Sequence, residues 1–225
     1  MFQGFSDATV DFMWGIRFNN ERSWFEAHKA EYLTHFQSPM RALAEEVCAP
    51  LLKKYENHGF VYKVSRIYRD ARRLHGRGPY KDHLWFSLEK PHEQWTSVPA
   101  LWFELSPEGA SWGLGYWTRP AAAAKLRARM DADPGPMEEL TRLIEARPHL
   151  TLKGEEYKRP KGVPPSELLA PWYRKKYFSV THEEKLGPAL YTPALADRVR
   201  ADFEYLMPLY EYFSTLEGDP EPDHL

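Results

Sequence analysis

The chain has 225 residues, of which 43% are hydrophobic and 28% charged, as expected of a globular protein with a substantial core. Its single cysteine, Cys48, excludes an internal disulfide and a thiolate metal cluster, and no apolar run is long enough to span a membrane. The net charge of −2 argues against a protein that binds nucleic acid with its whole surface. Because the amino terminus lacks a secretion signal, we expect a cytoplasmic protein.

The first part of the chain predicts helices. Ser6 is suited to cap a helix that ends near Phe18, since its hydroxyl can accept a hydrogen bond from the first turn. Asn19 and Asn20 are expected to cap a second helix, on which apolar residues recur at helical spacing from Phe25 onward.

A third helix is expected to begin at Ser38, with Pro39 in its first turn. Pro50 should interrupt this helix, because proline removes a backbone hydrogen bond and clashes with the preceding turn. The sequence Asn-His-Gly at residues 57–59 is expected to end it, with glycine in the left-handed conformation.

The middle of the chain predicts strands. Residues 60–70 alternate with period two, which places Phe60, Tyr62, Val64, Arg66, Tyr68 and Asp70 on one face. A short strand is expected over residues 84–89. A hairpin is expected from residues 100–105 and 111–117, around the turn Ser-Pro-Glu-Gly-Ala.

The two faces of this hairpin differ in chemistry. One is apolar and forms a core face; it carries Leu101, Phe103, Leu105, Trp112, Leu114 and Tyr116. The other carries Trp102 and Glu104 opposite Gly113 and Gly115. Glycine inside a strand often marks the close approach of a ligand or of another backbone. The glycines could equally relieve crowding beneath Trp102, and both interpretations stay open.

The remaining sequence completes an α+β pattern. We expect helices over residues 118–130 and 133–146, a long partly ordered loop over 148–171, a strand over 177–182, and a last helix from Thr192. Residues 217–225 are acidic and are expected to be a disordered tail. The sequence thus predicts a single domain over residues 1–216, with a mainly antiparallel sheet of about five strands packed by N- and C-terminal helices.

The strongest candidate site is an arginine-rich stretch with a glycine-containing loop. Residues 65–73 hold four arginines and one aspartate, and Gly76 and Gly78 precede Tyr80 and Lys81. Arginine forks and a lysine suit a phosphate or carboxylate ligand. The predicted binding residues are Arg66, Arg69, Asp70, Arg72, Tyr80, Lys81, Trp102 and Glu104. In the alternative interpretation, the arginines and Asp70 form an ion-pair network that ties the loop to the sheet.

Two weaker arrangements involve carboxylates and histidines. Asp70 and Glu104 could form an acid–base pair if their strands are neighbours. His28, Glu31 and His35 lie within reach of one helical face and could hold a divalent metal, although such a face is more often solvated. Phosphate-binding and dinucleotide-binding glycine motifs are absent. We therefore expect neither a metal nor a cofactor.

The second function hypothesis is a non-catalytic interaction module, or one associated with nucleic acid. Residues 60–90 hold eight basic against three acidic residues, and residues 152–176 hold seven against three. Residues 197–225 have the reverse balance, two against eight, which weakens the nucleic-acid alternative. A small anionic ligand is the preferred partner. Whether the protein catalyses a reaction and how it assembles are left open.

Several motifs in this chain resemble those of the DUF2461 family, a group of conserved hypothetical proteins. They are Asn19-Asn20, Trp24-Phe25, Lys29–Tyr32, R-I-Y-R-D at 66–70 followed by Arg72, P-Y-K at 79–81, G-L-G-Y at 113–116, L-K-G at 152–154 and K-R-P-K-G at 158–162. One departure is Arg-Leu-His-Gly-Arg at 73–77, where the family usually has a Phe-Ser-x-Asp-Lys-like segment. The resemblance implies a single α+β domain and names no reaction.

Overall fold

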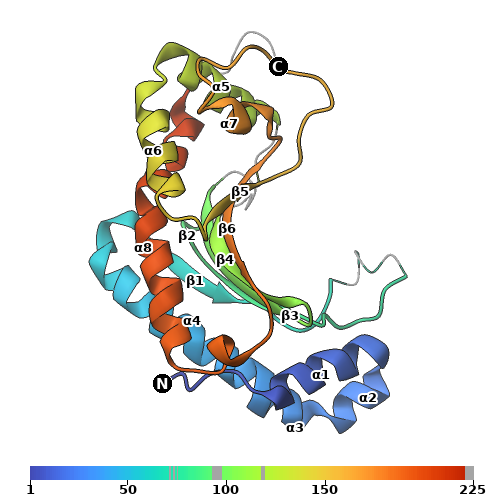
Figure 1. The fold of residues 1–225 in the computed structure, drawn as a ribbon. Coiled ribbons are helices and arrows are strands. Elements are labelled where there is room, and N and C mark those ends of the chain that lie inside the picture. The colour runs from blue at the N-terminus through green and yellow to red at the C-terminus, as the bar shows by residue number, and fades with distance from the viewer. Residues whose placement is uncertain (71, 73, 75, 93–97, 118–119, 221–225) are drawn as a thin grey trace. The chain divides into compact units, whose positions relative to one another are not determined.

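The fold is α+β, with helices on a six-stranded antiparallel sheet (Figure 1). The computed structural model describes residues 1–70, 72, 74, 76–92, 98–117 and 120–220. In order across the sheet, the strands are β1 (Val61–Val64), β2 (Leu84–Glu89), β3 (Ala100–Ser106), β4 (Gly109–Tyr116), β6 (Phe178–Glu184) and β5 (Thr151–Lys153). The predicted fold class is confirmed. The strand beyond the expected five is β5, whose three residues are too few to show an alternating pattern.

The described residues group into two compact units, and each is described by itself below. Unit 1 comprises Met1–Leu88, Trp102–Trp112 and Glu183–Ala201. Unit 2 comprises Glu89–Leu101, Gly113–His182 and Asp202–Leu225. The expected domain boundary at residue 216 remains a prediction.

Unit 1 begins with α1 (Asp7–Phe18), whose start agrees with the prediction. The Ser6 N–H donates to Thr9 Oγ1 at 3.1 Å and closes the first turn. The expected cap of the second helix at Asn19 and Asn20 is wrong. Asn19 ends α1 by donating its N–H to Gly15 O at 3.0 Å, and Glu21 precedes α2 (Arg22–Ala27).

The next helical segments run on without a break. They are α3 (Lys29–Glu31), a π-helical segment (Tyr32–Gln37) and α4 (Ser38–Lys54). The predicted helix start at Ser38, with Pro39 in the first turn, agrees with α4, but Ser38 does not cap a separate helix, since Gln37 and Ser38 are both helical. Pro50 does not interrupt α4 either: it is exposed, and the Glu46 carbonyl that it leaves unbonded accepts from Arg200 NH1 at 3.4 Å. Gly59, with φ of 64°, ends this region as predicted.

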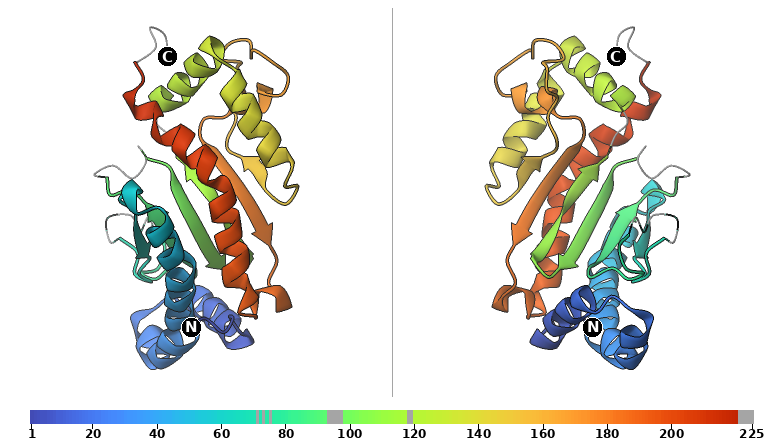
Figure 2. Two further views of the ribbon diagram at one scale, coloured as in Figure 1. Left: turned by 90° about the vertical axis from the view of Figure 1, so that its left-hand side faces the viewer. Right: turned by 90° about the vertical axis from the view of Figure 1, so that its right-hand side faces the viewer.

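The first strand of unit 1 is shorter than expected, and the second has the expected length. β1 has only four residues and packs against α4 (Figure 2), so the predicted strand over residues 60–70 is too long. Beyond β1, Tyr68 makes a single antiparallel bridge with Tyr80. β2 agrees with the prediction, and its Leu84, Phe86 and Leu88 are fully buried.

The predicted hairpin is confirmed by β3 and β4. Every member of its expected core face is at most 1% exposed: Leu101, Phe103, Leu105, Trp112, Leu114 and Tyr116. Trp102 and Glu104 alternate with these on β3 and are half-buried. The alternation therefore leaves the second face of β3 available for polar chemistry.

Neighbouring protein atoms account for the glycines of β4. A Cβ on Gly113 would lie 2.0 Å from the Val180 carbonyl oxygen of β6. A Cβ on Gly115 would lie 2.3 Å from the ring of Trp117. Of the interpretations left open, the close approach of another backbone is therefore the one that holds for Gly113, and Trp102 is not the crowding group.

Unit 2 contains α5 (Pro120–Ala132), α6 (Gly135–Glu145) and α7 (Ala170–Arg174), together with the later part of α8 (Ala194–Ser214). β5 pairs antiparallel with β6, with Thr151 opposite Thr181. Near the carboxyl end, Asp219 accepts from Arg129 Nε at 2.7 Å, and residues 221–225 lie outside the described residues. No helix among the described residues has the length and apolarity needed to cross a membrane.

Candidate functional site

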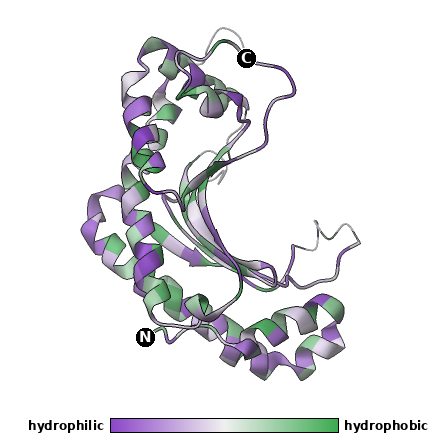
Figure 3. Ribbon diagram, viewed as in Figure 1, coloured by the Kyte–Doolittle hydropathy of each residue, from purple (hydrophilic) through white to green (hydrophobic). Residues whose placement is uncertain are grey.

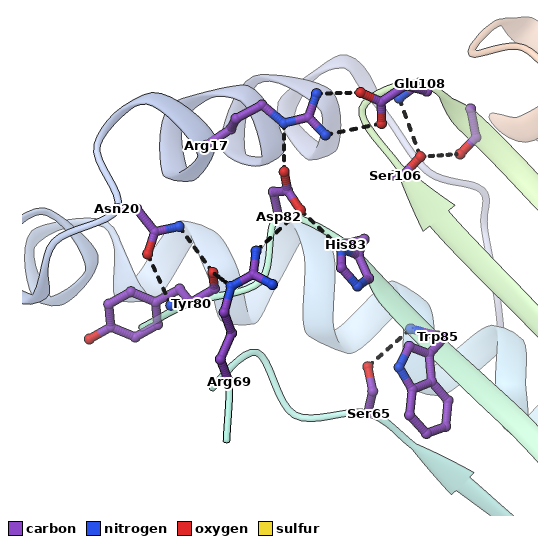
Figure 4. A network of polar contacts seen from close by, with 11 residues as sticks. Arg17, Asn20, Ser65, Arg69, Tyr80, Asp82, His83, Trp85, Ser106 and Glu108 are labelled. Carbon is purple, nitrogen blue, oxygen red and sulfur yellow. Dashed lines mark hydrogen bonds and ion pairs between the residues drawn. The ribbon is translucent and has the colours of Figure 1, made fainter. Parts of the chain in front are cut away.

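The centre of the arginine-rich region is Asp82, a residue that the sequence did not single out (Figure 4). Arg17 Nε donates to Asp82 Oδ2 at 2.5 Å, and Arg17 also pairs with Glu108. His83 Nδ1 lies 2.9 Å from Asp82 Oδ1. Burial alone would raise the pKa of the Asp82 carboxyl, but the hydrogen bonds from His83 and Arg17 outweigh burial and hold this pKa below its ordinary value. Asp82 is thus a fixed anion that orders its cationic neighbours.

Arg69 closes the base of the loop that follows. Its Nε donates to the Tyr80 carbonyl at 2.8 Å, and its NH2 lies 3.9 Å from Asp82 Oδ1. Asn20 clamps the same residue, donating Nδ2 to Tyr80 O at 3.0 Å and accepting from Tyr80 N at 3.0 Å. A Cβ on Gly78 would lie 2.1 Å from Asn20 Oδ1, so glycine there makes room for the clamp. This part of the stretch is an internal network, as the alternative interpretation expected.

Tyr80 itself belongs to the core. Only 3% of it is exposed, and its ring stacks on Phe25 with centroids 4.3 Å apart. The antiparallel bridge with Tyr68 fixes its backbone. Tyr80 therefore supports the loop, and its predicted role in ligand binding stays a prediction.

Asp70 and Arg72 form an exposed ion pair of their own. Arg72 donates Nε to Asp70 Oδ1 at 3.1 Å and NH2 to Asp70 Oδ2 at 2.9 Å, a bidentate contact. The Arg72 side chain is 88% exposed. The charge of Arg72 is thus already compensated. Arg73 and His75, in the segment that departs from the family pattern, lie outside the described residues.

Lys81 is placed differently from these arginines. Its N–H donates to Ile67 O at 2.7 Å, and its Nζ lies 5.7 Å from the centre of the Trp85 ring. Burial, and then the charges of Arg69 and Arg66, lower the pKa of the Lys81 ammonium to about 8, although the Glu104 carboxylate opposes them. Among the described residues, neither Lys81 nor Arg66 forms an ion pair.

These positions define the Lys81 site as Lys81, Arg66, Arg69 and Glu104. The charges of Arg69, Arg66 and Glu104 all act on the Lys81 ammonium, which is half-buried beside the Trp85 ring. Trp102 shares the face of β3 with Glu104. Of the eight predicted residues, these four interact electrostatically at Lys81, whereas Asp70, Arg72 and Tyr80 make the other contacts described above.

The remaining sequence hypotheses fare as follows. The proposed acid–base pair of Asp70 and Glu104 is wrong, because β2 separates β1 from β3 and Asp70 pairs with Arg72. His28 stacks on Trp24 with ring centres 3.9 Å apart, and the π-helical segment alters the helical spacing toward His35. Within the described part of the chain, no three His, Cys, Asp or Glu side chains are grouped to hold a metal.

A hollow of about 450 Å³ lies elsewhere in unit 1. It is lined by Ser106, Glu108, Gly109, Ala110, Ser111, Glu183, Glu184 and Lys185. Two of its acidic side chains form ion pairs, Glu108 with Arg17 and Glu184 with Arg198. None of the predicted site residues lines it, and it offers an anion no unpaired arginine.

Arg17, Asn20, Asp82 and Glu108 are the residues that sequence reasoning missed. Arg17 stands 65 positions from Asp82 and 91 from Glu108, so no local pattern joins them. Asp82 directly follows Pro-Tyr-Lys, which placed it beside the predicted site. An acidic residue within the basic stretch was therefore the one available signal.

Comparison with known protein families places the chain in a family. The family model described as "Conserved hypothetical protein (DUF2461)" matches residues 8–212 of the chain. No curated protein matches it.

Proposed function

We propose that this chain, which belongs to the DUF2461 family, binds a small anionic molecule at the Lys81 site. The observation that carries the proposal is the Lys81 ammonium itself. It is half-buried, lies beside the charges of Arg66 and Arg69, and has no ion-pair partner among the described residues. An anion at this position would stabilise charges that otherwise repel one another.

The internal network accounts for only part of the region. Arg69 is held by Tyr80 O and Asp82, and Arg72 by Asp70. Lys81 and Arg66 make no comparable contact with a residue that the structure describes. A purely structural role therefore explains the arginines that are already paired, but it does not account for the half-buried ammonium of Lys81.

The chemistry of these groups favours a phosphate or carboxylate. The Arg66 guanidinium presents a planar set of donors, and the Lys81 ammonium adds a point charge. Glu104 would repel a second anionic group on its side, so it selects for one concentrated charge. The ring of Trp85, half-buried next to Lys81, offers an apolar surface to the rest of the ligand.

Ligand-dependent stabilisation tests the proposal. Thermal unfolding is followed with a panel of small phosphates and carboxylates, because a ligand that binds the folded state raises Tm with concentration. Lys81→Met and Arg66→Met should each abolish the shift that one such compound produces. Lys63→Met, which changes an exposed lysine of β1, is the matched control and should keep it. Equal shifts in all three variants would refute the site.

A further inference from the structure

A buried cation that forms no ion pair with a described residue lies in unit 2, apart from the Lys81 site. Arg127, on α5, is only 7% exposed. Its NH1 is fully buried and has no hydrogen-bond partner, and the guanidinium forms no ion pair among the described residues. A buried charge that lacks both is strongly destabilising unless something else supplies the partner.

The contacts that Arg127 does make are with an aromatic ring. Its Cζ lies 5.4 Å from the centre of the Tyr157 ring. The Nζ of Lys161 lies 5.3 Å from the centre of the same ring. Two cations on one tyrosine repel each other, and the ring offsets only a small part of that repulsion.

The acidic group of α5 forms no ion pair with Arg127. Asp131, one turn further along the helix, has both carboxylate oxygens 2.7 Å from the Tyr173 hydroxyl. Burial, and then the hydrogen bond to Asp131, raise the pKa of Tyr173 to about 12, so the phenol stays protonated and keeps the carboxylate as its acceptor.

Other lysines occupy the carboxylates of the adjoining segment. Lys175 pairs with Glu156 at 2.9 Å, and Lys176 pairs with Glu155. Lys161 therefore has no ion pair with a described residue. Arg127 and Lys161, the two described cations that lie over the Tyr157 ring, thus both lack an ion pair with a described residue.

The loop residue that follows Lys161 lies close to the ring of Tyr173. Lys161 precedes Gly162, which has a φ of 132°, and a Cβ on Gly162 would lie 3.2 Å from the ring of Tyr173. Glycine thus lets the loop lie against the tyrosine that binds Asp131. The surrounding residues 154–169 are mostly hydrophilic (Figure 3). Lys161 belongs to the Lys-Arg-Pro-Lys-Gly motif at residues 158–162.

We infer that Arg127 and Lys161 form a phosphate-binding site beside Tyr157, in which the phosphate oxygens accept hydrogen bonds from both cations. The phosphate supplies acceptors to the Arg127 guanidinium and screens the two like charges from each other. Arg127 gives the site its geometry because it is fixed in the core, and Lys161 closes it from the exposed loop.

The probe for this site is inorganic phosphate, titrated calorimetrically into the full chain at low ionic strength. Arg127→Met and Lys161→Met should each weaken phosphate binding in unit 2 at least about tenfold, since each removes a charge-assisted hydrogen bond. Arg142→Met is the control, because Arg142 is exposed in the same unit and already pairs with Glu138. The titrations are repeated in a Lys81→Met background to remove the contribution of the Lys81 site.

The outcomes separate this site from the Lys81 site. One phosphate bound by the Lys81→Met chain, and lost on adding Lys161→Met, supports the inference even if the Lys81 site binds nothing. Phosphate binding that is absent, or unchanged by Lys161→Met, overturns it. An Arg127→Met chain that unfolds at a higher temperature and binds phosphate as before would also overturn it. Lys161 is exposed, so its variant tests the site even where Arg127→Met fails to fold.

Discussion

Arg17, in the last turn of α1, donates its Nε to Asp82 at 2.5 Å and so ties the first helix to the segment that carries Lys81. The side chains of the two residues are 28% and 16% exposed. The same carboxylate forms a hydrogen bond with His83 Nδ1 and lies near the Arg69 guanidinium. Asp82 therefore sets the position of Lys81 through its neighbours, without belonging to the Lys81 site itself.

Replacing Asp82 by asparagine should destabilise the fold by about 2–3 kcal/mol, because the largely buried cations around it lose their anion. Urea unfolding of the wild type and the variant measures the difference. Glu138→Gln is the control; it breaks an exposed ion pair between residues four apart on α6 and should cost less than about 0.5 kcal/mol. Equal effects of the two substitutions would show that the Asp82 network has no special weight.

The stability that Asp82 supplies should depend on pH. Its carboxyl has a lowered pKa in the folded chain, so the unfolded chain takes up the proton first as the pH falls. The contribution is complete above the ordinary pKa of 3.8 and is lost as the pH falls through the lower folded value. The difference in unfolding free energy between wild type and Asp82→Asn should therefore shrink only below pH 3.8. A difference that is constant down to pH 2 contradicts this.

Lys81 should give the opposite dependence. Its folded pKa of about 8 lies below the ordinary 10.5, so between these values the unfolded chain binds more protons and stability rises with pH. The free energy of unfolding of the wild type should rise by roughly 1–2 kcal/mol relative to that of Lys81→Met across this pH range, after allowance for the partial exposure of Lys81. Parallel denaturation curves at pH 7 and pH 10.5 measure the gain. No relative gain would mean that the lysine is solvated as in the unfolded chain.

Gly113 should be intolerant of a side chain. The Cβ of Gly113→Ala would lie 2.0 Å from Val180 O, so β4 and β6 must separate, and we expect a loss of about 2–3 kcal/mol. Gly187→Ala is the matched control, because a Cβ there meets nothing within 4 Å; it should change stability by less than about 1 kcal/mol. Thermal unfolding distinguishes the two, and a harmless Gly113→Ala would show that β4 and β6 can accommodate the methyl group.

The sequence predicted those elements whose pattern is local. The hairpin of β3 and β4 followed from strict alternation, and α1 from Ser6 and its first turn. Pro50 was misleading because a residue far along the chain, Arg200, hydrogen-bonds the carbonyl that proline leaves open. β5 was not predicted because its three residues are too few to show an alternating pattern.

The charge density of the sequence predicted where the candidate site lies. It did not predict which of the cations there form ion pairs and which do not. The arginine-rich stretch pointed to Lys81 and the surrounding cations. Which of them would be paired depended on Arg17, Asn20 and Asp82, whose contacts join distant segments. The unpaired Arg127 was equally invisible, since it differs from other helical arginines only in its burial.

The ionisation of Lys81 with and without an anion tests the central claim most directly. NMR titration of isotope-labelled lysine side chains, with the Lys81 signal identified by its loss in Lys81→Met, gives its pKa. We predict a pKa of about 8 in the free chain and a higher value with saturating inorganic phosphate or the best compound of the panel, because a bound anion favours the charged ammonium. A pKa near 10.5 in the free chain, or one that no anion raises, would contradict the proposed site.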